Sequence, residues 1–169
     1  MWSKWNWCEF TKHETNFEYF FNKTALIKAI SQSRDEKYEK IALFLISRDD
    51  INVNLADKKQ MTPLMKTVLK DNVNIYLQLY QKKDLDFNFK NKFGESFLHL
   101  SARIDNCKVI YEILKNKSLD INIKGEDEMT PLHLAVFNDN KSFCDAIIND
   151  ERIDVNAKCE QKFFQIFLF

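Results

Sequence analysis

The stretch EMTPLHLA at residues 128–135 recurs in weaker form as QMTPLMKT at 60–67 and as ESFLHLSA at 95–102. The Thr or Ser that opens each unit stands at positions 24, 62, 96 and 130, with separations of 38, 34 and 34 residues. Self-similarity at a fixed period of about 20 to 50 residues is typical of stacked repeats. The sequence therefore predicts a repeat fold.

A second marker closes each unit. The segments INVN, LDFN, LDIN and IDVN end at Asn54, Asn88, Asn122 and Asn156, each 34 residues after the previous one. The distance from the opening Thr or Ser to the closing Asn is 30 residues in the first unit and 26 in the others. We therefore expect four extra residues in the first unit, within the polar stretch SQSRDEKYEK at 31–40.

Between the markers, apolar residues at i, i+1, i+4 and i+5 predict one face of a helix. This column comprises Ile41, Ala42, Leu45, Ile46; Ile75, Tyr76, Leu79, Tyr80; Val109, Ile110, Ile113, Leu114; and Phe143, Cys144, Ile147, Ile148. A shorter helix precedes it, with Thr suited to the N-cap and Pro to the first turn. Its inward column is Leu26, Leu64, Leu98 and Leu132, with small residues at Ala29, Thr67, Ser101 and Ala135 for close approach. Neither helix can bury its stripe alone, so successive units must stack.

These features resemble the ankyrin repeat family, whose unit is a β-turn followed by two antiparallel helices. MTPLHLAV at 129–136 is a near-complete match to the family's Thr-Pro-Leu-His signature, and Asp154-Val155-Asn156 matches its closing motif. The resemblance implies an all-α solenoid of helix-turn-helix units with β-turn fingers. It divides the chain into an incomplete N-terminal capping unit at 1–23, four repeats at about 24–57, 58–91, 92–125 and 126–158, and a truncated fifth repeat or C-terminal half-cap at 159–169.

The glycines depart from the family pattern. Gly94 sits at the expected turn position, whereas Gly125 lies three residues earlier in its unit. Between the paired helices, Asp71-Asn72, Asp105-Asn106 and Asp139-Asn140 stand where the family has Gly. Asp and Asn tolerate left-handed backbone better than other residues, so we expect these turns to form with some loss of stability.

The sequence contains few residues that are candidates for catalysis, metal binding or nucleic-acid binding. Formal net charge is zero, with 25 basic and 25 acidic residues, which does not favour nucleic acid as a partner. Cys8, Cys107, Cys144 and Cys159 form no CxxC pair and have no zinc-like spacing with His13, His99 and His133. The resemblance implies that the imidazoles of His99 and His133 form hydrogen bonds near the helix start and connect neighbouring turns. We therefore expect no catalytic, cofactor-binding or metal-binding residues, and no enzymatic activity.

In ankyrin proteins, partners usually touch the turn tips and the exposed end of the first helix. Transferred to this chain, the partner-binding positions are Lys58, Lys59, Met61, Leu69, Lys70, Lys92, Phe93, Glu95, Arg103, Ile104, Glu126, Asp127, Met129, Phe137 and Asn138. Apolar anchors set among charges are what a protein-binding patch requires. The resemblance thus implies a non-catalytic scaffold that binds another protein through its concave face. The alternative reading of each position is an ordinary solvated turn residue.

Two narrower hypotheses remain open. The chain is either a structural fragment of a larger ankyrin protein, or a decoy inhibitor of a Rel-type transcription factor. In size and make-up it also resembles the inhibitor-of-NF-kappaB-like ankyrin proteins of some insect viruses. The free thiols and the absence of a secretory h-region favour the cytoplasm or nucleus. FFQIFLF at 163–169 is far shorter than the roughly 20 residues of a membrane span. We therefore expect no membrane association and a monomer, with self-association through this tail as the alternative.

Overall fold

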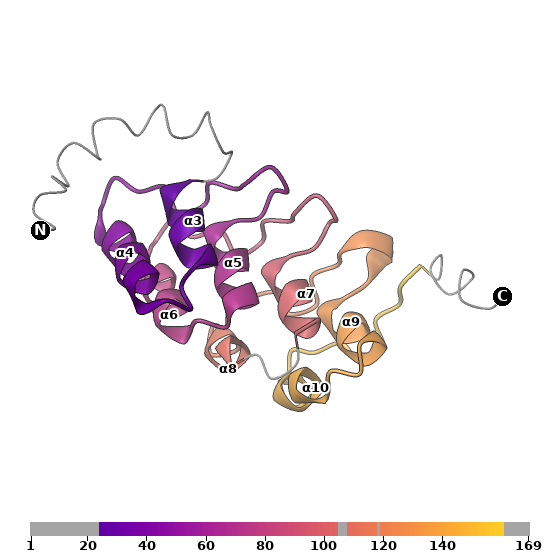
Figure 1. Ribbon diagram of the computed structural model, residues 1–169. Helices are drawn as coiled ribbons and strands as arrows, with labels where there is room; N and C mark the ends of the chain where they lie inside the picture. Colours follow the sequence, from indigo (N-terminus) through magenta and orange to yellow (C-terminus); the bar gives the residue numbers. More distant parts are fainter. Residues whose placement is uncertain (1–23, 105–107, 118, 161–169) are drawn as a thin grey trace, which may run out of the picture.

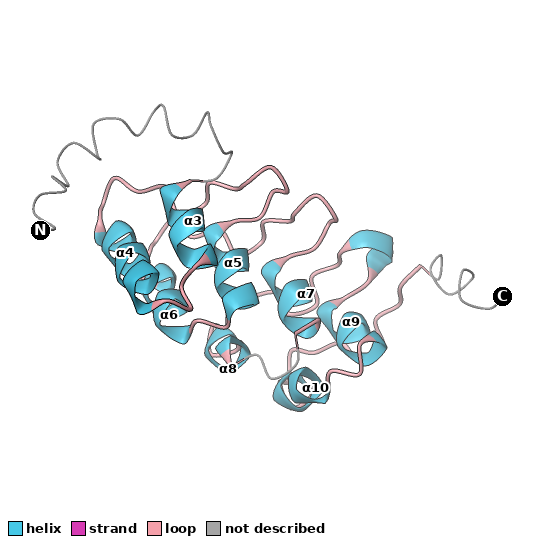
Figure 2. Cartoon of the chain, in the orientation of Figure 1, coloured by secondary structure: helices cyan, strands magenta, loops and turns pink. Residues whose placement is uncertain are grey.

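The computed structural model describes residues 24–104, 108–117 and 119–160, and its helices stack in two layers (Figures 1 and 2). The described residues contain no strand and eight α-helices with one 3-10 helix. Their bounds are α3 Ala25–Ser31, α4 Glu36–Ser47, α5 Pro63–Lys70, α6 Val73–Tyr80, α7 Phe97–Ala102, α8 Val109–Ile113, η2 Glu126–Glu128, α9 Pro131–Phe137 and α10 Lys141–Ile147. The helix order confirms the predicted all-α repeat fold. None of the described helices is long and apolar enough to cross a membrane.

One layer contains the first helix of each unit and the other contains the second. Helices α3, α5, α7 and α9 contact one another in that order, and α4, α6, α8 and α10 do the same. Of the predicted inward column, Leu26, Leu64 and Leu98 are buried between successive first helices, whereas Leu132 in the last unit is only partly buried. The small side chains of Ala29, Thr67, Ser101 and Ala135 are also buried in this layer, which allows the helices to approach closely.

The opening Thr or Ser is the N-cap of every first helix. The Oγ1 of Thr24 accepts a hydrogen bond from the amide of Ile27 at 3.1 Å, and Thr62 accepts from Met65 at 3.3 Å. Pro63 begins α5 and Pro131 begins α9, where the missing N–H costs no helical hydrogen bond. The repeated signature therefore fixes where each first helix starts.

The turn between the paired helices uses Asp and Asn in place of Gly, as predicted. Asp71 and Asp139 have φ of 51° and 53°, in the left-handed region. Asn72 and Asn140 then cap α6 and α10 by accepting from the third residue beyond, at 3.0 Å each. Asp71 gains a second role, because its Oδ1 accepts from the amide of Val109 in the next unit at 3.0 Å. The equivalent pair at 105–106 lies outside the described residues.

The closing Asn joins consecutive units. Asn54 donates from Nδ2 to the carbonyl of Asp84 at 2.6 Å and accepts at Oδ1 from the amide of Asp86 at 2.9 Å. Asn122 makes the same pair of bonds with the fourth unit, at 2.8 Å each. The amide therefore satisfies backbone groups of the neighbouring unit, which explains why it recurs at a fixed spacing.

The first unit and the helix ends differ in detail from the predicted pattern. The turn before α4 covers residues 32–35 where the turn before α6 covers 71–72, and α4 has 12 residues where α6 has 8, so the insertion lengthens both the turn and the second helix. Tyr80 and Ile148 were expected in the buried column, but both are exposed. Each stands at the end of a short helix, whereas Ile46 is buried because α4 continues past it. The expected burial of Tyr80 and Ile148 is therefore wrong.

Candidate interaction surface

The fingers are tight turns that precede α5, α7 and α9 and project on one side of the stack (Figure 1). A backbone hydrogen bond closes each of them, from the amide of the first residue to the carbonyl of the fifth. The pairs are Asp57 with Met61 at 3.1 Å, Asn91 with Glu95 at 2.9 Å, and Gly125 with Met129 at 2.7 Å. Positive φ recurs at the equivalent positions Gln60, Gly94 and Glu128. Gly94 therefore occupies the turn position expected from the sequence, and the other fingers place larger residues in the same strained conformation.

The side chain at the base of a finger holds its shape. Oδ1 of Asp57 accepts from the amides of Lys59 and Met61, and Oδ1 of Asn91 accepts in the same way from its own finger. Burial of Asp57 opposes ionisation, but the amide of Met61 and an ion pair with Lys66 at 3.1 Å bring the pKa of Asp57 below its usual range. Gly125 has no side chain at this position, and the fourth finger adopts left-handed backbone at two successive residues instead.

The structure exposes most of the predicted partner-binding side chains. The exposed ones are Lys58, Lys59, Leu69, Lys92, Phe93, Arg103, Glu126, Phe137 and Asn138. Partly exposed are Lys70, Glu95, Ile104, Asp127 and Met129. Met61 is only 6% exposed, and its sulfur accepts a hydrogen bond from Nδ2 of Asn91 at 3.5 Å. The prediction that Met61 lies at the surface is wrong, because the next finger packs over it.

Charge on the fingers changes sign along the stack. Lys58, Lys59 and Lys92 lie on the second and third fingers, and Glu126 and Asp127 lie on the fourth. The ion pairs at the fingers are Lys66 with Asp57 at 3.1 Å, Arg103 with Glu95 at 2.6 Å, and Lys124 with Glu128 at 2.6 Å. None of these pairs uses the three finger lysines, so their charges are available to a partner.

Apolar side chains lie among these charges. Phe93 is 57% exposed at the tip of the third finger. Leu69 and Phe137 occupy equivalent positions at the ends of α5 and α9, with 41% and 57% of their surfaces exposed. Arg103 occupies the same position in the unit between them. Aromatic and aliphatic side chains of this kind can supply binding energy once a partner removes them from water.

His99 has a structural role. Its Nδ1 accepts from the backbone amide of Ser96 at 3.1 Å, so the neutral ring carries its proton on Nε2 and donates it to the carbonyl of Met129 at 3.0 Å. Burial lowers the pKa of His99, which favours this neutral form. The ring caps α7 and also ties the third unit to the fourth, which confirms the role that the resemblance implied.

His133 caps α9 in the same manner, with Nδ1 accepting from the amide of Thr130 at 3.2 Å. The described residues contain no group of three or more His, Cys, Asp or Glu side chains placed to hold a metal ion. Of the other residues considered, Cys144 and Cys159 are free and partly buried. His13, Cys8 and Cys107 lie outside the described residues.

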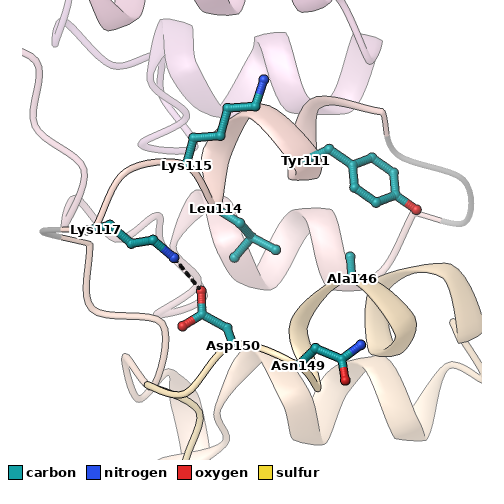
Figure 3. Close-up of a pocket in the computed structure, with 7 residues that line it drawn as sticks. All are labelled: Tyr111, Leu114, Lys115, Lys117, Ala146, Asn149 and Asp150. Carbon is teal, nitrogen blue, oxygen red and sulfur yellow. Dashed lines mark ion pairs between the residues drawn. The ribbon is translucent and has the colours of Figure 1, made fainter.

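A shallow cavity of about 460 Å³ lies on the opposite layer, between α8 and α10 (Figure 3). Ala146 lines it, and the equivalent positions of α6 and α8 hold the larger side chains Gln78 and Glu112. The charged groups that line it are paired: Lys117 contacts Asp150 at 3.6 Å, and Lys115 contacts Glu112 at 2.7 Å. Among the lining residues, Tyr111 and Asn149 carry the polar side chains that are outside these ion pairs.

Arg152 is the important residue that sequence reasoning missed. Its guanidinium donates to the carbonyls of Leu114, Asn116, Lys117 and Leu119, and forms two bonds with Asp150 at 2.9 and 2.7 Å. The pKa of Asp150 is well below its usual range because of these bonds. Arg152 therefore holds the end of α8 and the loop that follows. No local motif marks it, since its four carbonyl acceptors all belong to the preceding unit.

Residues 75–159 match the family model described as ankyrin repeats, in three copies. The match begins in α6 and covers the third and fourth units completely. No curated protein matches the chain.

Proposed function

Because the chain belongs to the ankyrin repeat family, whose members generally serve as protein–protein interaction modules, we propose that it is a non-catalytic scaffold. It binds a partner protein through the concave face formed by the fingers and the first helices. The family is typically non-enzymatic, and the charged side chains that line the cavity between α8 and α10 are already in ion pairs.

The observation that supports this proposal is the row of exposed apolar side chains set among charges of both signs. Leu69, Phe93 and Phe137 lie on the face that carries the finger lysines and the acidic fourth finger. Burying such side chains supplies binding energy of roughly 25 cal/mol per Å² before the costs of association. The charges steer and orient the partner. We infer a partner whose contact surface is apolar at its centre, acidic toward the second unit and basic toward the fourth.

The proposed contact set is the predicted one without the buried Met61. It comprises Lys58, Lys59, Leu69, Lys70, Lys92, Phe93, Glu95, Arg103, Ile104, Glu126, Asp127, Met129, Phe137 and Asn138. Arg103 and Glu95 are already paired at 2.6 Å, so a partner that uses either must replace this bond. We therefore expect the finger lysines and the exposed apolar residues to dominate affinity.

Charge reversal tests the proposal. In the variant Lys58→Glu with Lys59→Glu, affinity capture from cell extract should lose the partner, while the melting temperature stays unchanged because both side chains are exposed. The control is Lys37→Glu with Lys83→Glu, which changes net charge equally on residues away from the fingers. Identical capture by the two variants would remove the finger lysines from the interface.

The narrower hypotheses have less support. A decoy role against a Rel-type transcription factor rests on size and repeat make-up, and architecture is weak evidence for function. A supporting role within a larger ankyrin protein stays a hypothesis as well. Neither one changes the face proposed for binding.

A further inference from the structure

The end of the stack carries an apolar groove of about 250 Å³ on α9 and the segment after α10. Leu132, Val136 and Val155 line it, together with Met129, His133 and Cys159. Val136 is 67% exposed, whereas Val68 and Ala102, at the equivalent positions of α5 and α7, are 0% exposed. In the inner units, the next first helix covers this face. The groove is therefore the seam of the stack, which is the surface of a first helix that the next first helix covers, and on α9 this surface is open.

The chain after α10 already follows the path of a further unit. The amide of Glu160 donates to the carbonyl of Asp127 at 2.8 Å. The same bond joins Lys92 to Lys59 at 3.2 Å, 68 residues earlier, which is two repeat periods. Lys92 lies on the third finger, so residue 160 stands at the equivalent place of a fifth finger. Cys159, the residue before it, lines the groove.

The histidine at the groove lacks a bond that its counterpart makes. Nε2 of His99 donates to the carbonyl of Met129 at 3.0 Å, across the junction between the third and fourth units. Nδ1 of His133 accepts from Thr130, which leaves Nε2–H as a donor, and that donor has no acceptor among residues 24–104, 108–117 and 119–160. One period beyond Met129 is Phe163, whose carbonyl would occupy the equivalent position.

We propose that residues 163–169, FFQIFLF, occupy this groove as the first helix of a fifth unit. In the repeat register, Ile166 corresponds to Leu132 and packs against α9. The carbonyl oxygen of Phe163 accepts a hydrogen bond from the Nε2–H of His133. Phe164 takes the place of the N-cap Thr, so this helix has no capping side chain and depends on apolar contact with α9. The groove shares Met129 and Phe137 with the contact set proposed for the concave face, so the test of this proposal follows Cys159 and not partner capture.

The thiol of Cys159 lines the groove and reports on its occupancy. The test uses the full chain with Cys8→Ser, Cys107→Ser and Cys144→Ala, and follows the rate at which Cys159 reacts with Ellman's reagent. A buried charge at the seam displaces the helix, so Ile166→Asp should raise the rate about tenfold or more. The control Lys162→Asp changes the finger position equivalent to Gly94 and Glu128, and should leave the rate unchanged.

Two outcomes would overturn the proposal. Equal reaction rates in the parent chain, Ile166→Asp and Lys162→Asp would show that the tail does not cover Cys159. Protection that increases with protein concentration, together with a dimer in analytical ultracentrifugation, would show that a second copy fills the groove. The concave-face proposal is tested separately by Lys58→Glu with Lys59→Glu, because neither lysine lines the groove.

Discussion

His99→Met tests the most specific contact between units. Met65 occupies the equivalent position of α5, so the fold tolerates this side chain in the same environment. The substitution removes the acceptor of the Ser96 amide and the donor to the Met129 carbonyl. A buried backbone group left without its partner costs about 1 to 3 kcal/mol. We expect a loss of about 3 kcal/mol in the free energy of unfolding at pH 7.5, which lowers the melting temperature by about 10 °C.

The pH dependence supplies the sharper part of the test. Burial lowers the pKa of His99 below the value near 6.5 of the unfolded chain, so the unfolded state binds the proton first as pH falls. The stability that the neutral ring contributes is fully present above that value and is lost as pH falls below it. The difference between the parent chain and His99→Met should therefore shrink between pH 7.5 and 5.5. The carboxylates with lowered pKa values, such as Asp57 and Asp150, lose their contributions only at lower pH.

The assay is urea unfolding followed by circular dichroism at 222 nm, at both pH values, with His133→Met as the control at a partly exposed equivalent site. A difference in unfolding free energy that stays constant between pH 7.5 and 5.5 would refute the argument that His99 acts as a neutral ring. A neutral effect of His99→Met at pH 7.5 would show that the two hydrogen bonds do not stabilise the stack.

Four further substitutions test other contacts. Gly125→Ala would place a Cβ 2.8 Å from Nε2 of His99, so calorimetry should show a loss of about 1 to 3 kcal/mol and a weaker pH dependence. Arg152→Ala removes the donor to four carbonyls of the third unit, and urea unfolding should show a loss of about 2 to 3 kcal/mol; an unchanged midpoint would contradict the proposed role. Asp139→Gly relieves positive φ and should raise the melting temperature, with a gain of up to about 1 kcal/mol. Asp71→Gly should gain less or lose stability, because it also removes the bond to the next unit, and equal gains for both aspartates would argue against that bond.

The sequence predicted the features that each unit makes within itself. Thr24, Thr62, Ser96 and Thr130 cap their helices, and the Asp-Asn pairs form the described turns, because these bonds join residues at most five positions apart. The burial of Leu26, Leu64 and Leu98 also followed from periodicity. The four extra residues of the first unit were located correctly, although their division between the turn and α4 could not be read from composition.

Contacts between units were harder to predict. Met61 was expected at the surface because it lies in a finger, and only the position of Asn91 in the next finger shows that it is covered. Tyr80 and Ile148 match the apolar column, but their exposure depends on where α6 and α10 end. Whether the surface residues bind a partner stays a prediction. Periodicity identifies which residues are equivalent, and neighbouring units decide how far each of them is covered.

The hydrogen bonds of Asn140 and Arg152 affect the order in which the units fold during synthesis. Nδ2 of Asn140 donates to the carbonyls of Ala102 and Ile104 at 2.9 and 2.8 Å, and Arg152 holds the carbonyls after α8. The short α8 has no side-chain cap of its own. A nascent chain emerges from the ribosome N-terminus first, at about 5 to 20 residues per second. The third unit can therefore complete its hydrogen bonds only after residue 152 has emerged, although the unit itself ends near residue 125.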